Sequence, residues 1–158
     1  MPSYVLVDTN IWHFAFVKPR EQEFAEVHAL ARDAVEELLT DRGVRIAMSA
    51  YQAGEVIEVL RRSGVGLETR EGLLRDLGTG KFFVKDLTFD AVISALSDSA
   101  ESGIHVYDYL VAYPLKGIVG RMYSADDHFQ HEHFRFAEVV NPVAPWILRE
   151  GVKPTKIR

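Results

Sequence analysis

The chain has 158 residues, of which 47% are apolar and 26% charged, a composition typical of one globular domain and not of a disordered or fibrous protein. A net charge of −5 argues against non-specific coating of nucleic acid, and the lack of cysteine excludes disulfides and thiolate metal sites. No apolar run approaches the roughly 20 residues that span a bilayer, and the chain enters a strand at once instead of a signal segment, so we expect a cytoplasmic protein with no membrane contact.

Strand-like and helix-like segments alternate along the chain. Short apolar runs predict strands at 3–7, 44–49, 82–84, 117–123 and 136–140. Apolar residues at helical spacing predict helices at 11–17, 21–40, through 55–62, 67–77, from a cap at Thr88 or Asp90 to about 100, and at 104–115, where Pro114 introduces a kink. This alternation predicts an α/β fold in which helices cover both faces of a parallel sheet.

Carboxylates recur near the ends of the predicted strands. Asp8 directly follows the first strand, and Thr9 and Asn10 after it are expected to cap the next helix. Glu55 and Asp108 lie in the first turns of two later helices. Asp126 and Asp127 follow the fourth strand. Because the carboxyl ends of parallel strands share the edge of the sheet at which ligands bind, we expect these acids to converge there.

A cluster of ionised carboxylates needs a compensating cation. Two carboxylates about 5 Å apart repel by roughly 3 kcal/mol at an effective dielectric constant near 20. Protonation or a bound cation relieves the repulsion, and hard divalent ions prefer oxygen ligands, so Mg²⁺ or Mn²⁺ is favoured over Zn²⁺. Such an ion can orient water, lower its pKa and neutralise charge on a phosphodiester, which is the chemistry of metal-assisted phosphoryl hydrolysis.

Four short motifs in this order resemble the PIN-domain ribonucleases, a family that includes the toxins of VapBC toxin–antitoxin pairs. They are Val5-Leu6-Val7-Asp8-Thr9-Asn10, Ser49…Glu55-Val56, Asp108…Ala112 and Ser124-Ala125-Asp126…Phe129. The resemblance covers about residues 3–140 and implies a three-layer α/β/α sandwich with a five-stranded parallel sheet. We expect the nuclease domain to span 1–145 and, from its composition, a basic C-terminal tail to follow at 146–158. The resemblance also implies a Mg²⁺- or Mn²⁺-dependent endoribonuclease that acts on single-stranded RNA, forms a homodimer and, in a toxin setting, is covered at its cleft by an antitoxin protein.

The same resemblance assigns roles to particular residues. The catalytic, metal-binding set would be Asp8, Glu55, Asp108 and Asp126, supported by the small polar residues Asn10 and Ser124. The chain also departs from the family pattern: Gln52 stands where Thr is more usual, Pro114 interrupts a helix that is normally continuous, and the chain is longer than a minimal toxin. Asp127 is an extra acid that could bind the metal, although we prefer Asp126.

Other functions fit some of these features. A non-catalytic module that binds RNA or an antitoxin would keep the acids only as vestiges, and another metal-dependent phosphohydrolase would also place acids at strand ends. The segment 126–133 could itself hold a metal, because His128 and His131 would share one face of a helix, but solvated histidines are the preferred interpretation. His13, His28 and His105 have no partner pattern and are expected to be structural.

Basic and aromatic residues have two interpretations each. A basic set could guide RNA phosphates or be solvated, namely Arg61, Arg62, Lys81 and Lys85. An aromatic set could stack on bases or, as we expect, pack in the core or at a dimer interface, namely Trp12, Phe14 and Phe16. Three tyrosines could line the cleft or be half buried, namely Tyr107, Tyr109 and Tyr113. The last ten residues carry four basic side chains against one acid and are expected to form a solvated tail.

Overall fold

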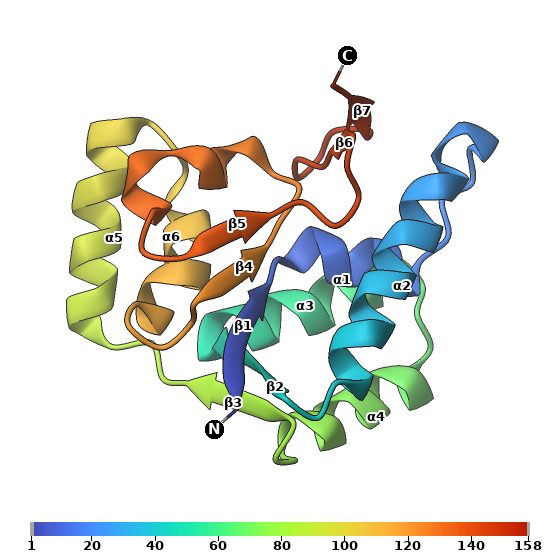
Figure 1. The fold of residues 1–158 in the computed structure, drawn as a ribbon, viewed down its shortest axis with the longest axis horizontal. Helices are drawn as coiled ribbons and strands as arrows, with labels where there is room; N and C mark the ends of the chain where they lie inside the picture. The colour runs from blue at the N-terminus through green and yellow to red at the C-terminus, as the bar shows by residue number, and fades with distance from the viewer. Residues whose placement is uncertain (1, 158) are drawn as a thin grey trace.

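A five-stranded parallel sheet forms the centre of the computed structural model, which describes residues 2–157 (Figure 1). The strands follow the order β3-β2-β1-β4-β5 across the sheet. Their bounds are Ser3–Val7 for β1, Val44–Ser49 for β2, Phe82–Lys85 for β3, Arg121–Tyr123 for β4 and Glu138–Val140 for β5. The predicted parallel sheet is confirmed, and the order of its strands reverses between β1 and β4, where open α/β sheets form their ligand crevice.

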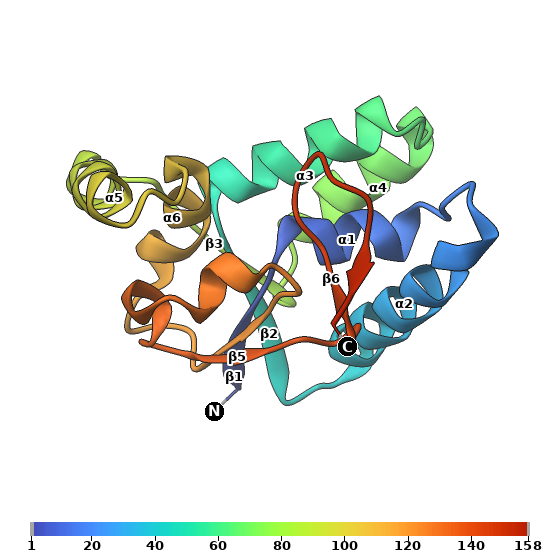
Figure 2. The same cartoon turned by 90° about the horizontal axis from the view of Figure 1, so that it is seen from above.

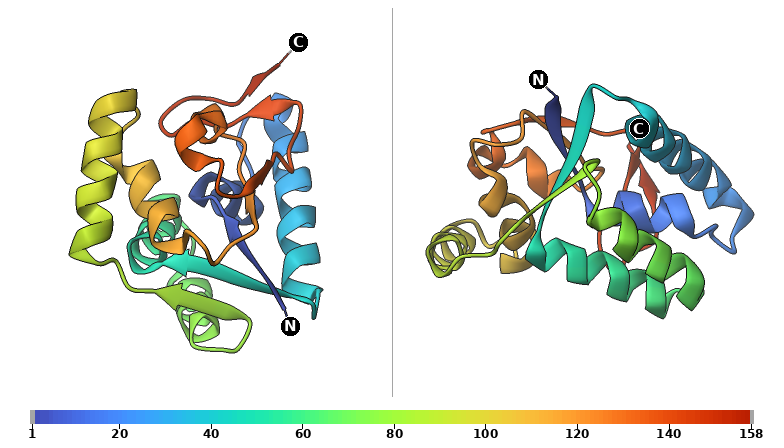
Figure 3. Two further views of the ribbon diagram at one scale, coloured as in Figure 1. Left: turned by 60° about the vertical axis from the view of Figure 1, so that its left-hand side comes forward. Right: turned by 90° about the horizontal axis from the view of Figure 1, so that it is seen from below.

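Helices cover both faces of this sheet. The α-helices are α1 Thr9–Phe16, α2 Ala25–Thr40, α3 Ala50–Arg62, α4 Leu67–Leu77, α5 Phe89–Ser102 and α6 Val106–Ala112. Short 3₁₀ turns are η1 Gln22–Phe24, η2 Tyr113–Leu115, η3 Asp127–Gln130 and η4 Glu132–Phe134. The helices α1 to α4 lie on one side and α5 and α6 on the other, as the turned views show (Figures 2 and 3). The three-layer α/β/α sandwich is therefore confirmed.

The central strand β1 supplies apolar side chains to both layers. Val5 and Val7 point into the core beneath α1 to α4, whereas Leu6 points into the core beneath α5 and α6. All three are almost fully buried. A near-continuous apolar run is what a strand covered on both faces requires, because successive side chains alternate between the faces.

Several predicted elements have different bounds, each for a local reason. The predicted helix 21–40 begins with the 3₁₀ turn η1 before α2. The predicted helix 104–115 ends as α6, and η2 follows, because Pro114 has no N–H to continue the α-helical pattern. The predicted strand 117–123 is shortened to β4, since Gly117 has a φ of +78° and the backbone N–H groups of Ile118 and Val119 donate to the carbonyl of Leu115 in a turn.

The C-terminal segment is a β-hairpin instead of a frayed tail. Strands β6 Trp146–Ile147 and β7 Thr155–Lys156 pair antiparallel. Trp146 and Leu148 are buried in the core, where the indole packs edge-on against Phe24 with ring centres 5.7 Å apart. The last ten residues are predicted to form a solvated tail, and within 149–157 all but Pro154 are exposed, so their solvation is confirmed. They are not frayed, because β7 pairs with β6 and the residues just before them, Trp146 and Leu148, are buried against the layer of α1 and α2. None of the helices within residues 2–157 is long and apolar enough to cross a bilayer.

Candidate active site

Asp8 and Asp126 lie side by side where the order of the strands reverses. Asp8 follows β1 and Asp126 follows β4, and these strands pair with Val7 opposite Tyr123. The hydroxyl of Ser124 donates a 2.8 Å hydrogen bond to Oδ2 of Asp8 and accepts a 3.1 Å bond from the backbone N–H of Asp126. One small side chain thus positions both acids.

Asp8 is also the N-cap of α1, and Glu55 of α3 contacts Thr9, the first residue of that helix. The backbone N–H of Thr9 donates a 2.8 Å bond to Oδ1 of Asp8, which is the N-cap of α1. The prediction that Thr9 and Asn10 cap this helix is therefore wrong, because α1 starts two residues earlier than expected. The Thr9 hydroxyl instead donates to Oε1 of Glu55, whose Oε2 accepts a 3.0 Å bond from the hydroxyl of Tyr51.

Asp108 projects from the first turn of α6 between two histidines. Its Oδ2 lies 3.3 Å from Nε2 of His105 and 3.0 Å from Nδ1 of His128. The same nitrogen of His128 lies 3.5 Å from Oδ1 of Asp126. His128 therefore bridges two of the predicted acids, Asp108 and Asp126, and His105, which the sequence predicts to be merely structural, lies beside the first of these.

The four predicted acids line one pocket. Its lining consists of Asp8, Thr9, Asn10, Glu55, Val59, Asp108, Asp126 and Glu150. A larger hollow of about 820 Å³ lies between α2 and strands β1, β4 and β5, but none of the four acids lines it. The carboxylates come from β1, α3, α6 and the loop after β4, so segments far apart in sequence meet at one edge of the sheet.

Burial and mutual repulsion disfavour ionisation of these carboxylates. Burial is the largest cause that raises the pKa of Asp8 well above its usual value, and the charge of Asp108 adds to it. Burial likewise raises the pKa of Asp108 to about 6, against the attraction of His105, and raises the pKa of Glu55 and of Asp126. Within residues 2–157, lysine and arginine form no salt bridge with any of the four. The pocket thus holds an acidic cluster whose side-chain partners are histidines and hydroxyls and not lysine or arginine.

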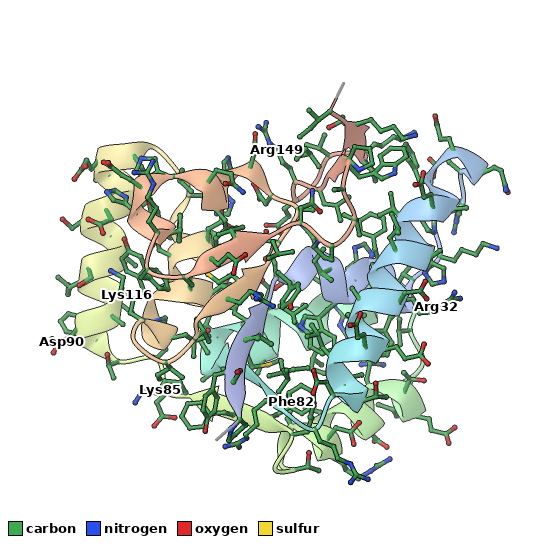
Figure 4. All side chains as sticks on the ribbon, in the orientation of Figure 1. Arg32, Phe82, Lys85, Asp90, Lys116 and Arg149 are labelled. Carbon is green, nitrogen blue, oxygen red and sulfur yellow. The ribbon has the colours of Figure 1, made fainter. Side chains whose placement is uncertain are left out.

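Asp127 pairs with Arg149 of the hairpin, although one of its carboxylate oxygens lies within 4.8 Å of ligand atoms of Asp126 and His128. Nε of Arg149 donates a 2.8 Å bond to Oδ1 of Asp127, and Nη2 of the same arginine pairs with Oδ2. The hydrogen bonds from Arg149 hold the pKa of Asp127 below its usual value. Arg149 lies at the side of the molecule from which the hairpin projects (Figure 4). Of the two neighbouring acids, Asp126 is the one that lines the pocket.

The comparisons with known proteins concern the fold. No protein-family model and no curated protein matches the sequence. Among solved structures, VapBC2 from Rickettsia felis bound to a DNA fragment from its promoter matches with a TM-score of 0.57 and 17% identity, covering 87% of this chain and 98% of that chain. VapC20 from Mycobacterium tuberculosis, a sarcin-ricin loop cleaving toxin, matches with a TM-score of 0.60 and 15% identity, covering 80% of this chain and 92% of that one. The chain has a VapC-like PIN-domain fold.

Two polar residues that the motifs single out have different surroundings within this VapC-like fold. Asn10 lines the pocket, but its amide donates a 3.4 Å bond to the carbonyl of Leu148 in the hairpin and not to an acid. Gln52, where the family more often has Thr, is fully buried, and its amide donates a 2.6 Å bond to the carbonyl of Val7 at the end of β1. Gln52 therefore holds the backbone next to Asp8, and Asn10 holds the hairpin beside the pocket.

Glu150 is a pocket residue that sequence reasoning misses. It follows the hairpin strand β6 and lines the acid pocket together with Glu55. Its charge helps to raise the pKa of Glu55. The sequence carries no local signal for this position, because only the burial of Trp146 and Leu148 brings the hairpin back over the sheet edge.

Two further histidines, His131 and His133, and Lys81 do not line the acid pocket. His133 lies 3.3 Å from Glu101 of α5, so it does not join His128 in one cluster, and His131 accepts a bond from the backbone of His133. The helix on which His128 and His131 would share a face is replaced by the 3₁₀ turns η3 and η4. Lys81 donates to the carbonyls of residues 41 and 44, so its ammonium group stabilises the backbone at the start of β2, and it does not line the acid pocket.

An aromatic groove adjoins the acid pocket. Tyr51 and Tyr107 stack with ring centres 6.0 Å apart and planes at 14°, and Tyr107 is 53% exposed. Both line a groove with Arg62, and Glu55 and Glu150 line this groove as well as the acid pocket. The other tyrosines of the predicted set, Tyr109 and Tyr113, are buried in the core, as is Trp12 of the other aromatic set. Tyr107 is thus the tyrosine of α6 that faces solvent beside the acids.

Proposed function

We propose that this protein is a Mg²⁺- or Mn²⁺-dependent endoribonuclease that hydrolyses phosphodiester bonds of single-stranded RNA. The observation that carries the proposal is the convergence of Asp8, Glu55, Asp108 and Asp126 on one pocket without a lysine or arginine to neutralise them. Stability alone gives no reason to gather three buried acids and the half-buried Glu55 in one pocket, because each raised pKa is a cost to the folded state. A divalent cation removes that cost.

The donor set fits such an ion. Carboxylate oxygens are the ligands that Mg²⁺ and Mn²⁺ prefer, and in the bound state the cation supplies charge neutralisation and activation of water for attack on phosphorus. In our proposal Asp8, Glu55, Asp108 and Asp126 hold it. Ser124 orients two of these acids, and Thr9 and Tyr51 orient Glu55 through its two oxygens.

The aromatic groove supports RNA as the substrate. Every base presents a flat π-face, and stacking on an exposed aromatic side chain holds a single strand without selecting its sequence. The pair Tyr51–Tyr107 offers such a surface within reach of the acids, and Arg62 in the same groove offers a partner for a phosphate. A duplex keeps its bases stacked on one another, so an unpaired strand fits this groove better.

We further propose that the protein is the toxin of a toxin–antitoxin pair and forms a homodimer. The VapC-like fold and the four motifs support this, and an antitoxin peptide would cover the acid pocket. Trp12 is 1% exposed, so it contributes to the core and not to an interface. On α5, by contrast, Phe89, Ile93 and Leu96 are exposed at helical spacing and form an apolar face suited to a second copy.

The decisive experiment replaces Asp8 with asparagine. Asn is as good an N-cap as Asp, so Asp8→Asn keeps α1 while it removes one charge from the cluster. We expect RNA cleavage in Mn²⁺ to fall at least a hundredfold and the metal-free protein to unfold at the same or a higher temperature. Asp90→Asn, at an exposed position of α5 (Figure 4), is the matched control and should keep full activity.

Other outcomes would point to the other classes of function. Loss of both activity and folding in Asp8→Asn would mean that the acid is a structural cap. No RNA cleavage by the wild type together with an unchanged melting midpoint on adding Mn²⁺ would indicate a non-catalytic module, because an ion that binds only the folded state must raise that midpoint. Hydrolysis of phosphomonoesters but not of RNA would indicate another phosphohydrolase.

A further inference from the structure

Two imidazole nitrogens converge on one carboxylate oxygen at the outer side of Asp108. Nε2 of His105 lies 3.3 Å and Nδ1 of His128 lies 3.0 Å from Oδ2 of Asp108. His105 precedes α6 by one residue, and His128 comes from η3, so two separate elements present their rings to the same atom. The rings stand edge to face with centres 5.6 Å apart. Neither nitrogen belongs to the four acidic motifs.

The arrangement has the dimensions of a small cation site. One ligand atom from each of His105, Asp108 and His128 lies within 4.8 Å of the others. Ligands that sit about 2.1 Å from a transition ion are at most roughly 4.2 Å apart, so small side-chain rotations would close these three around one ion. Asp126 also reaches His128, at 3.5 Å, and could supply a further oxygen.

The chemistry of these donors differs from that of the inner pocket. The acid pocket offers oxygens from buried carboxylates, whereas the outer side of Asp108 offers two nitrogens from side chains that are 40% and 32% exposed. Carboxylates suit Mg²⁺ and Mn²⁺, but imidazole favours transition ions, and Mg²⁺ is hard and keeps its waters instead of taking nitrogen. An ion that accepts both donor types gains more from this site than Mg²⁺ does.

We propose that His105, Asp108 and His128 form a mixed nitrogen–oxygen subsite that binds Mn²⁺ in preference to Mg²⁺. The subsite adds two histidine ligands beside the metal site of the proposed function. It rests on that proposal only because both sites include Asp108. Its occupant is a divalent transition ion, represented by Mn²⁺, and the two histidines are its selective ligands. The competing explanation is that they only donate hydrogen bonds to the carboxylate.

The test is metal binding measured apart from activity. Full-length protein is titrated with Mn²⁺ and, separately, with Mg²⁺ by calorimetry, and the Mn²⁺ form is examined by pulsed electron paramagnetic resonance for modulation from directly bound ¹⁴N. We expect Mn²⁺ to bind at least tenfold more tightly than Mg²⁺ and to show imidazole nitrogen coupling. In His105→Gln and in His128→Gln the affinity for Mn²⁺ should fall about tenfold or more while the affinity for Mg²⁺ changes less than twofold.

The controls separate this proposal from folding and from the nuclease proposal. His131→Gln, on the turn after His128 but directed to the backbone of residue 133, should keep the wild-type affinities. Unfolding midpoints in EDTA establish that each variant is folded. Absence of nitrogen coupling, or equal Mn²⁺ affinity in wild type and both variants, would overturn the subsite even if RNA cleavage is intact. Nitrogen coupling without any RNA cleavage would support the subsite and refute the nuclease.

Discussion

The hydroxyl of Ser124 donates to Oδ2 of Asp8 across 116 positions of sequence. The contact follows from the pairing of β1 with β4, which brings the residues after Val7 and Tyr123 to the same level of the sheet edge. Because Ser124 also accepts the N–H of Asp126, its position fixes the spacing between two carboxylates. A binding site for a cation depends on that spacing.

Replacing Ser124 with alanine should therefore weaken cation binding more than it weakens the fold. The buried carboxylate of Asp8 loses one donor, which typically costs about 1–3 kcal/mol of unfolding free energy. We expect affinity for Mn²⁺ to fall roughly tenfold or more because the ligands are no longer held in place. Calorimetric titration and urea unfolding measure the two effects. Ser94→Ala, at an exposed position of α5, should change neither, and unaltered Mn²⁺ binding in Ser124→Ala would contradict the positioning role.

The convergence of the acids could be foreseen from sequence because it depends on the topology of the sheet and little on side-chain detail. Asp8 and Asp126 come directly after parallel strands, so any right-handed α/β arrangement brings them to one edge. Glu55 and Asp108 lie near the start of helices, and the direction of α3, which carries Glu55, is set by the same rule. The positions of Asp8, Glu55 and Asp126 therefore follow from the alternation of strands and helices, whereas Asp108 lies in α6, which follows another helix, α5, and so depends also on how these two helices pack.

Other parts of the site depend on long-range packing, which local patterns do not encode. Glu150 reaches the pocket because Trp146 and Leu148 are buried against distant elements. His128 meets Asp108 across 20 positions of sequence because the 3₁₀ turn η3 lies beside the start of α6. That contact depends on tertiary packing, so the sequence gives no local signal for it.

The raised pKa values predict how the stability of the metal-free protein changes with pH. Asp108 has a usual pKa of 3.8 and a folded value of about 6, so between these values the unfolded chain releases a proton that the folded chain retains. Its contribution to the unfolding free energy therefore falls as pH rises through this window, by about 1.4 kcal/mol for each unit of the shift, and stays reduced above it. Asp8, Glu55 and Asp126 act in the same direction.

The measurement compares wild type and Asp108→Asn in EDTA. Asparagine does not ionise, so the melting midpoint of the variant should rise relative to that of the wild type as pH increases from about 4 to about 7. Adding Mn²⁺ at pH 7 should reverse the difference, because only the wild type binds the ion with all its ligands. A midpoint difference that does not change with pH would show that Asp108 is already compensated in the metal-free protein.

The neighbouring acids Asp126 and Asp127 should respond differently to the same change. Asp126 is buried in the pocket, whereas Asp127 is paired with Arg149 at the surface. We expect Asp126→Asn to abolish RNA cleavage and Asp127→Asn to retain most of it, with a loss of stability within about 1 kcal/mol, as is usual for an exposed ion pair. Cleavage assays and urea unfolding on the pair of variants decide the assignment. Equal loss of activity in both would place Asp127 among the metal ligands.

Replacing Tyr107 tests whether the RNA strand binds along the aromatic groove. Its ring is half exposed and stacks on Tyr51, which in turn donates to Glu55. Base stacking on an aromatic side chain is worth about 1–3 kcal/mol, so Tyr107→Ala should raise KM for a single-stranded oligoribonucleotide roughly tenfold or more and leave kcat within about twofold. Tyr107→Phe keeps the stacking face and should behave as the wild type. If the alanine variant also keeps the wild-type KM, the strand does not run along Tyr107, because removing the ring would then have removed no contact with the substrate.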